Sequence, residues 1–387
     1  MVRHTSFAPL AVAAFLLAVV PASAENGVSE QEVVFGQAAA LDGPAAALGT
    51  GMQAGINAAF AQANKAGGVN GRTLKLISYD DGYEPERSIA QVKKLIDEDK
   101  VFGLIGPVGT PTAKATQPIA TEAKVPFIGP FTGAGFLRDA KLGNVVNVRA
   151  TYGAETEQWI KHLTEDLKFD KIAILYQDDA FGRVGLDGVN KALDKRGMKL
   201  VAEGTFQRNT VAVKSALLEI KKSEPQAVVM VGPYKPIAEF IKVSHKVKFN
   251  PTFVNISFVG SDALAKELGA DGEGVIVSQV VPSPWDVSIP LIKEYQEALK
   301  AADATAEPGF VSLEGYMVGK LTVMALAKVQ GDLTREAFLK TIWDTGSFDM
   351  GGVTLEFGAD DNQGSDEVFM TVIQKDGSFK QVEKLTM

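Results

Sequence analysis

Hydrophobic and polar positions follow two different periods along most of the chain. From Glu32 onward, short runs of β-branched and apolar residues alternate with longer stretches in which apolar residues recur every three or four positions. Short apolar runs are typical of buried strands, and the longer period is typical of amphipathic helices. This alternation predicts parallel sheets with helices on both faces.

The alternation occurs in two consecutive series. The first predicts strands at 33–38, 74–79, 101–105 and 125–128, with helices between them, one of which has its apolar positions at Met52, Ile56, Phe60 and Ala63. The second, after Arg149, predicts helix 155–167, strand 171–176, helix 184–196, strand 199–206, helix 211–222, strand 227–231 and helix 236–247. Two such series predict an α/β protein with two doubly wound, Rossmann-like lobes.

The last third of the chain follows a different pattern. After an expected strand at 275–281 come helices at 289–301, 310–329 and 335–343, and then β patterns at 353–357 and 368–374. Because helices without intervening strands usually pack on an existing sheet, we expect the chain to return to the first lobe near 281–285 and to leave it near 351–356. This gives three hinge crossings between a first lobe of 25–150 plus 282–352 and a second lobe of 151–281 plus 353–387.

The first 24 residues have the pattern of a cleaved signal peptide. Arg3 and His4 precede an apolar run from Phe7 to Val20, and Ala22-Ser23-Ala24 has the small residues of a cleavage site. An uncleaved anchor is the alternative, but the apolar run is shorter than the roughly 20 residues that span a bilayer. We therefore expect a periplasmic protein that is not embedded in the membrane.

Charge and composition argue against several functions. The formal net charge is −8 and no basic run offsets it, so nucleic acid is not an expected partner. The chain has no cysteine, and His162 and His245 lie in expected helices without a second histidine one turn away, so neither a thiol nucleophile nor a metal site is predicted. We expect no cofactor and no enzymatic activity.

One glycine-rich segment keeps an alternative open. Gly49 to Gly55 resembles a dinucleotide-binding fingerprint, follows an expected strand and opens an expected helix. However, about ten residues separate the strand from Gly49, whereas the fingerprint requires a tight turn directly after the strand. An NAD(P)-dependent dehydrogenase is therefore an alternative function.

The ends of the expected strands form a candidate binding cleft. In doubly wound sheets, ligands lie beyond the carboxyl ends of the strands, where helix N-termini present free N–H groups. Thr110 and Thr132 stand in two such loops and could hold a carboxylate together with backbone amides; capping of the following helices is the equally weighted alternative. Tyr152, Phe181 and Tyr234 occupy equivalent places in the second lobe and are expected to form the opposite wall.

Several motifs share their order and spacing with a known family. They are Ala38 to Pro44, Ala66 to Gly71, Tyr79-Asp80-Asp81, Pro85 to Ala90, Ile105-Gly106-Pro107, Val125-Pro126, and Asp178 to Gly182 followed by Gly185. With these motifs the chain resembles the type I periplasmic solute-binding proteins of ABC importers, in the branch of leucine/isoleucine/valine and amide binders. The resemblance implies a small-molecule ligand held between two lobes and an ABC-importer membrane permease as partner; a ligand-sensing subunit of a membrane receptor is an alternative.

The resemblance also implies roles for individual residues. It places the ligand carboxylate at Thr110 and at Phe131, Thr132 and Gly133, aromatic walls at Phe181 and Tyr234, and a first-lobe contact at Leu48.

Ser257 stands near the position where amino-acid binders carry a glutamate for the ligand ammonium. Glu314 is a candidate replacement; without it, the ligand would be an aromatic or aliphatic acid, or an amide. Asp42 occupies a position commonly held by Ser or Thr, and its role is open.

Overall fold

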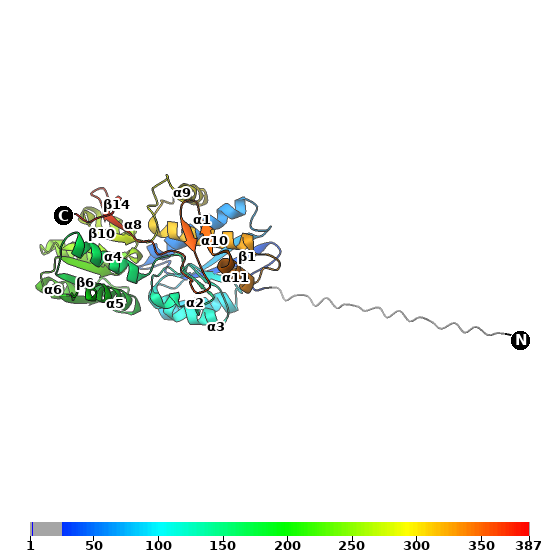
Figure 1. Cartoon of the computed structure of the whole chain (residues 1–387), viewed down its shortest axis with the longest axis horizontal. Coiled ribbons are helices and arrows are strands. Elements are labelled where there is room, and N and C mark those ends of the chain that lie inside the picture. The colour runs from blue at the N-terminus through cyan, green and yellow to red at the C-terminus, as the bar shows by residue number, and fades with distance from the viewer. Residues whose placement is uncertain (1, 3–24, 387) are drawn as a thin grey trace.

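Two separate sheets organise the chain into two α/β lobes (Figure 1). The computed structural model describes Val2 and residues 25–386, so the expected signal peptide at 1–24 lies outside the described residues. The two-lobed α/β architecture expected from the sequence is confirmed. We call the five-stranded sheet with its helices lobe 1, and the seven-stranded sheet with its helices lobe 2.

Lobe 1 contains an entirely parallel sheet in the order β2-β1-β3-β4-β5. Its strands are β1 (Glu32–Ala39), β2 (Thr73–Asp80), β3 (Gly103–Ile105), β4 (Phe127–Ile128) and β5 (Val145–Val146). Neighbouring residues of the central strands point to opposite faces, and both faces are buried: Ile105 packs in one core cluster and Leu104 in another. Burial on both sides explains the nearly continuous apolar runs of these strands.

Helices cover both faces of this sheet (Figure 1). On one side lie α1 (Ala46–Lys65), α9 (Pro290–Ala302) and α10 (Phe310–Lys328), and on the other lie α2 (Pro85–Asp97) and α3 (Thr110–Glu122). The helix α11 (Arg335–Thr345) and the small hairpin of β11 (Ser347–Asp349) and β12 (Thr354–Glu356) complete the lobe. By length and composition α10 could span a membrane, but 78% of its most apolar window is buried inside the protein, so it is a core helix.

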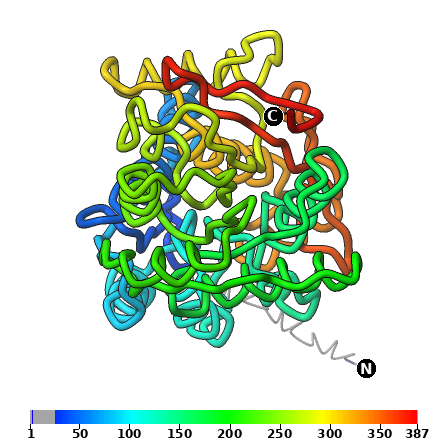
Figure 2. The backbone as a smooth tube through the Cα atoms, turned by 90° about the vertical axis from the view of Figure 1, so that its left-hand side faces the viewer, coloured from blue at the N-terminus to red at the C-terminus, as the bar shows by residue number. Residues whose placement is uncertain are grey.

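Lobe 2 contains a mixed sheet in the order β14-β13-β10-β9-β8-β6-β7. Its strands are β6 (Ile172–Gln177), β7 (Ala202–Phe206), β8 (Ala227–Val231), β9 (Thr252–Asn255), β10 (Ile276–Gln279), β13 (Phe369–Ile373) and β14 (Phe379–Val382). Its helices are α4 (Tyr152–Glu165), α5 (Ala180–Asp194), α6 (Lys214–Lys222), α7 (Tyr234–Lys246) and α8 (Ser261–Leu268). Figure 2 shows the red C-terminal segment beside the yellow-green part of lobe 2, where β13 pairs antiparallel with β10.

Small residues bring α1 and α10 into close contact. A Cβ atom on Gly55 would lie 2.0 Å from the carbonyl oxygen of Ser312, and one on Gly315 would lie 2.4 Å from the carbonyl oxygen of Met52. Gly49 lies within α1, where a Cβ would meet the carbonyl oxygen of Ala40 at 1.9 Å. The segment 49–55 is therefore part of a helix and not a phosphate-binding turn, so the dinucleotide-fingerprint interpretation is wrong.

The chain passes between the lobes three times. The first crossing lies between β5 and α4, and the second between β10 and α9. We expected the third near 351–356, but Asn147 beside β5 accepts a hydrogen bond from Gly364 and donates one to Asn362. Residues up to Gly364 therefore remain with lobe 1, and the third crossing lies between Gly364 and Phe369, because backbone pairing with β5 holds this segment in place.

Candidate ligand-binding site between the lobes

The carboxyl ends of the strands of both lobes face each other across the interface. Tyr83 follows β2 in lobe 1, and its hydroxyl accepts a 3.4 Å hydrogen bond from the amide of Gln177 at the end of β6. Local capping fixes the neighbouring aromatics: Thr151 accepts the N–H of Ala154 and so starts α4 at Tyr152. Both sides of the candidate site are thus built from strand ends and helix starts.

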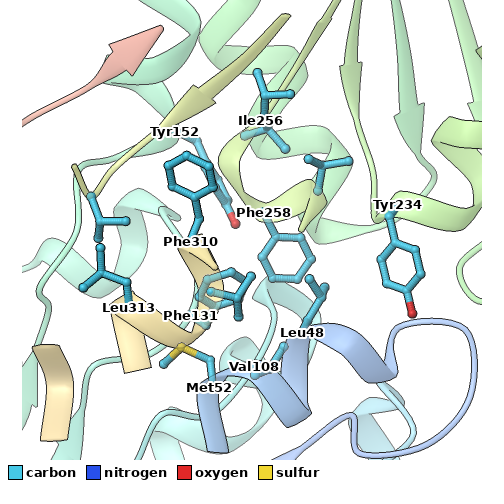
Figure 3. Packing of buried hydrophobic residues seen from close by; sticks show 14 of the residues in the cluster. Leu48, Met52, Val108, Phe131, Tyr152, Tyr234, Ile256, Phe258, Phe310 and Leu313 are labelled. Carbon is cyan, nitrogen blue, oxygen red and sulfur yellow. The ribbon is translucent and has the colours of Figure 1, made fainter. Parts of the chain in front are cut away.

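Five aromatic rings form a continuous group at this interface, which we call the Phe258 cluster: Tyr83, Phe131, Tyr152, Phe181 and Phe258. The ring centroid of Phe258 lies 4.6 Å from that of Phe181, 5.2 Å from that of Phe131 and 5.9 Å from that of Tyr83. All five side chains are buried. Figure 3 shows Phe258 descending from lobe 2 between Phe131, Leu48 and Val108.

The two threonines expected at the site lie together. The hydroxyl oxygens of Thr110 and Thr132 are 2.6 Å apart, and both side chains are fully buried. Gly109, at a φ of 106°, is the N-cap of α3, so Thr110 is the first helical residue and its side chain does not cap the helix. In the first turn of α3, Pro111 has no N–H and Ala113 donates to the carbonyl oxygen of Gly109, so the backbone donors left for a ligand are those of Thr110 and Thr112.

Close contact with Tyr152 requires a glycine at position 133. The carbonyl oxygen of Gly133 accepts the N–H of Tyr152 at 2.8 Å. A Cβ atom at this position would lie 2.6 Å from Cδ1 of Tyr152. The loop after β4 therefore fixes where the tyrosine ring enters the Phe258 cluster.

A buried arginine links both lobes. Nη1 of Arg149 lies 3.5 Å from Oε1 of Glu314 in α10, and Nη2 lies 3.4 Å from Oε1 of Glu155 in α4. Nη2 also donates to the hydroxyl of Ser257. Glu155 accepts the backbone N–H of Ser257 at 2.9 Å and its hydroxyl at 2.8 Å. Glu155 thus supplies a carboxylate beside position 257 in lobe 2, and it comes from a different element than the sequence suggested.

One guanidinium faces two carboxyl groups in this cluster. Burial raises the pKa of Glu314 to about 7, with repulsion from Glu155 adding to the increase and attraction by Arg149 opposing it. Burial also raises the pKa of Glu155. Glu314, the candidate counter-charge for a ligand amine, is therefore paired with Arg149. With both carboxyl groups ionised, the three side chains carry a net charge of −1.

Polar atoms without hydrogen-bond partners surround the aromatic rings. Within the described residues, these include Nε of Arg149, the hydroxyl of Tyr152 and Oε1 of Gln177, all buried. The guanidinium carbon of Arg149 lies 5.0 Å from the ring centroid of Phe131 and 5.7 Å from that of Tyr152. Figure 3 shows the Tyr152 hydroxyl directed toward the middle of the group. Because buried polar groups normally have partners, these atoms mark a place suited to a polar ligand.

Leu48 and Tyr234 lie at one end of the interface. The Tyr234 hydroxyl accepts the N–H of Ala47 at 3.4 Å, and Leu48 packs against Gly260, where a Cβ atom would lie 2.6 Å from a Leu48 methyl carbon. Figure 3 shows Tyr234 set apart from Phe131 and Phe258. Tyr234 therefore bridges the lobes beside the cluster and does not stack within it. A groove of about 490 Å³ between the lobes begins next to Ala47 and Gly260.

Polar contacts close the interface on its outer side. Arg208 of lobe 2 donates to Glu84 of lobe 1 at 2.7 Å and to Asp179 of its own lobe at 2.9 Å. The neighbouring Asn209 donates to the carbonyl oxygen of Gly82 at 3.0 Å. These bonds join the loop after β7 to the loop before α2.

Sequence reasoning missed four residues that shape this site: Tyr83, Arg149, Glu155 and Phe258. Arg149 and Glu155 carried a usable signal, because each is a charged residue within a segment that is otherwise apolar on its buried side. Phe258 and Tyr83 carried none, since single aromatics in loops are usual packing residues. Within residues 25–386, no group of three or more Asp, Glu or His side chains is placed to hold a metal ion.

The arrangement of two lobes and an interlobe site agrees with comparisons with known proteins. A family model described as periplasmic binding protein matches residues 32–378. The chain belongs to this family. Its relatives include the Leu/Ile/Val-binding protein homolog 7 of Brucella suis biovar 1 (strain 1330), which is 25% identical over 341 residues, covering 83% of this chain and 82% of the relative.

Solved structures of similar proteins share the whole fold with this periplasmic binding protein. A possible leucine/isoleucine/valine-binding protein from Rhodopirellula baltica SH 1 is 37% identical, with a TM-score of 0.88 over 94% of this chain and 100% of that one. An extracellular ligand-binding receptor from Verminephrobacter eiseniae ef01-2 is 30% identical, with a TM-score of 0.82 over 90% and 99% of the two chains. This periplasmic binding protein is thus a member of a solute-binding family related to amino-acid transport.

Proposed function

We propose that this periplasmic binding protein captures a small carboxylate-bearing solute between its lobes and delivers it to the permease of an ABC importer. Lobe 1 comprises 25–150 together with the returning segment that ends near Gly364, and lobe 2 comprises the remaining residues up to the C-terminus. The proposal rests on one observation: buried polar atoms without partners gather where the strand ends of the two lobes meet.

The solute carboxylate is expected to lie at Thr110 and Thr132. Their paired hydroxyls, 2.6 Å apart, and the backbone N–H groups of Thr110 and Thr112 offer donors without a full positive charge. The nearby cations are already engaged: Arg138 donates to the carbonyl oxygens of Thr132 and Ala134, and Arg149 pairs with Glu155 and Glu314. A carboxylate at the threonine pair therefore avoids competing with two buried carboxyl groups for one guanidinium.

The charges near Arg149 bear on whether the solute also has an amine. Arg149, Glu155 and Glu314 together carry a charge of −1 when both acids are ionised, which favours an ammonium group beside them, and the nearby guanidinium of Arg138 offsets part of this charge. A solute without an amine is instead compatible with a protonated Glu314, whose pKa of about 7 allows that form at neutral pH. The solute is thus an amino acid, an amide, or an aromatic or aliphatic acid.

Calorimetric titration of residues 25–387 with amino acids, amides, and aromatic and aliphatic acids tests the proposal. In an unfolding experiment with the solute present at 100 times its dissociation constant, binding is expected to add about 2.7 kcal/mol to the free energy of unfolding. Absence of binding to every compound of these classes would contradict it. NADH serves as a negative control, because the glycine segment 49–55 lies inside α1.

The residue assignment has its own test. Thr110→Val removes one hydroxyl of the threonine pair and is expected to weaken binding of the solute's carboxylate by about tenfold to 150-fold, since hydrogen bonds to charged groups contribute about 1.5–3 kcal/mol. Thr116→Val is the matched control, because Thr116 is a buried threonine of the same helix whose hydroxyl donates to the carbonyl oxygen of Thr112. Equal affinity of Thr110→Val and wild type would exclude Thr110 from the site.

Export and cleavage after Ala24 are part of the proposal. Glu25, the first residue after the proposed cleavage point, is already part of the folded structure, because its carboxylate accepts the backbone N–H of Arg335 at 3.1 Å. Mass spectrometry of the protein released from the periplasm is expected to show a chain beginning at Glu25. A retained N-terminal segment would contradict cleavage without affecting the proposed solute binding.

A further inference from the structure

The ring of Phe258 fills a socket that belongs largely to other elements. Phe258 lies in a short helical turn of lobe 2, Ser257–Val259, while Tyr83 and Phe131 belong to lobe 1. The planes of the flanking rings are tilted by 32° for Phe131, 35° for Tyr83 and 56° for Phe181. These offset and tilted geometries at short centroid distances are those that aromatic rings prefer.

We propose that Phe258 is an intramolecular competitor for the solute and thereby determines its class: the solute that takes the place of this ring in the socket carries an aromatic ring next to its carboxylate. This inference rests on the proposed solute-binding function and adds the substrate class to it. A small aromatic acid, such as benzoate or phenylacetate, represents the class.

The size and chemistry of the socket support an aromatic occupant. The side chains around Phe258 are fully or almost fully buried, and the socket that they form holds the ring of Phe258. An aliphatic group of the same volume would fill the space but would lose the ring–ring interactions with Tyr83, Phe131 and Phe181. The socket is therefore expected to favour planar rings over saturated groups of the same size.

The position of the polar groups supports a carboxylate on that ring. Phe131 of the socket directly precedes Thr132, whose hydroxyl is paired with that of Thr110. The Tyr152 hydroxyl is a buried donor that lacks a partner within the described residues, and its ring belongs to the cluster. A ring in the socket can therefore place a carboxylate among these donors.

Release of Phe258 follows from the way it is held. When the lobes separate, the ring leaves Tyr83 and Phe131 together with lobe 2, since neighbouring Ser257 is anchored there by Glu155. Closure over a bound aromatic acid then requires the Phe258 side chain to rotate away. Gly260, at a φ of 77°, follows the turn and lets the backbone pass close to Leu48. The contacts of Phe258 in the socket reduce the fraction of protein molecules that can bind the solute, and this lowers the apparent affinity for the solute.

The test is calorimetric titration of wild type and Phe258→Ala with benzoate, phenylacetate and cyclohexanecarboxylate, the last being a saturated ring of similar size. Removal of the competing ring is expected to tighten binding of at least one aromatic acid by about tenfold or more. Cyclohexanecarboxylate is expected to gain less, because it cannot form the ring–ring contacts. Phe258→Leu keeps an apolar side chain, and its affinity for aromatic acids is expected to lie between those of wild type and Phe258→Ala. It provides a second variant if Phe258→Ala folds poorly.

Phe240→Ala is the matched control. Phe240 is a fully buried phenylalanine of lobe 2 that contacts Phe253 and lies outside the Phe258 cluster, so its loss is expected to lower stability without tightening binding of any acid. The inference would be overturned if Phe258→Ala and Phe258→Leu bound aromatic acids no more tightly than wild type. It would also be overturned if wild type preferred L-leucine to every aromatic acid. Either result would leave the proposed function in place. Failure of wild type and variants to bind any acid, amino acid or amide would overturn the proposed function itself.

Discussion

Arg208 of lobe 2 donates a 2.7 Å hydrogen bond to Glu84 of lobe 1, and this ion pair joins the lobes directly. The two side chains are 22% and 36% exposed, so the pair is partly screened by solvent. The ion pair lies beyond the Phe258 cluster and joins two different lobes, so it forms only when the lobes are closed.

Arg208→Gln is expected to weaken solute binding about threefold to tenfold, because partly exposed ion pairs contribute on the order of 1 kcal/mol. The loss is expected to shrink at high salt, which screens the wild-type pair. Titration at low and high ionic strength measures both effects. Arg183→Gln, which breaks the more exposed pair with Asp178 within lobe 2, is expected to leave affinity unchanged.

Glu314 is expected to make stability depend on pH. Its pKa is raised from 4.5 to about 7 in the folded protein, so the folded state binds this proton more tightly than the unfolded state. The contribution of Glu314 to the free energy of unfolding is therefore largest below pH 4.5 and falls as the pH rises through about 7. Glu314→Gln removes this dependence, and its stability relative to wild type is expected to rise between pH 5 and pH 8 by up to about 3 kcal/mol.

Urea unfolding of wild type and Glu314→Gln at several pH values measures this difference directly. Comparing the two proteins cancels other groups whose pKa burial also raises, among them Asp81 and Asp262. A difference in stability that is the same at every pH would show that Glu314 does not titrate in this range.

The hydroxyl groups of two buried tyrosines differ in their hydrogen bonding. The Tyr152 hydroxyl has no partner within the described residues, whereas that of Tyr295 accepts the N–H of Gly309 at 2.9 Å and pairs with the hydroxyl of Ser312 at 2.6 Å. Tyr152→Phe is expected to leave the free energy of unfolding unchanged or raise it by about 1 kcal/mol, while Tyr295→Phe lowers it by about 1–3 kcal/mol. Thermal or urea unfolding distinguishes the two variants.

The same pair also separates binding from stability. If the Tyr152 hydroxyl meets the solute, Tyr152→Phe binds it more weakly even though the protein is no less stable. Destabilisation of Tyr152→Phe equal to that of Tyr295→Phe would show that the Tyr152 hydroxyl has a partner within the protein.

Close packing of α1 against α10 predicts a sharp response to one added methyl group. Gly55→Ala places a Cβ atom against the carbonyl oxygen of Ser312 and is expected to lower the free energy of unfolding by about 1–3 kcal/mol. Gly143→Ala is the control, because a Cβ atom there meets nothing within 4 Å. Equal stabilities of the two variants would mean that the helices can separate without cost.

Local pattern was enough to predict much of the fold. The strand at 227–231 was predicted with its observed bounds, because five consecutive apolar residues in a doubly covered sheet leave little choice of structure. The two-residue strand Val145–Val146 and the strand Thr252–Asn255 were missed, since their strand character depends on pairing with β4 in one case and with β8 and β10 in the other. The third crossing was misplaced for the same reason: backbone bonds to Asn147 keep 362–364 in lobe 1.

The site was less accessible to sequence reasoning. Thr110, Thr132 and Phe181 could be located because strand ends and helix starts define positions in a doubly wound sheet. The pairing of Arg149 with Glu314 could not, because it joins residues 165 positions apart through a side-chain contact. Phe258 fills space that only the meeting of the two lobes creates.

The contact between α1 and α10 also bears on the order in which the polypeptide folds. These helices bury one another although some 250 residues of chain separate them, so the first half of the molecule cannot reach its native packing while it is still being synthesised. Until residue 328 has emerged from the ribosome, the glycine-lined face of α1 lacks its partner. Lobe 1 can therefore complete its packing only after most of the chain has been made.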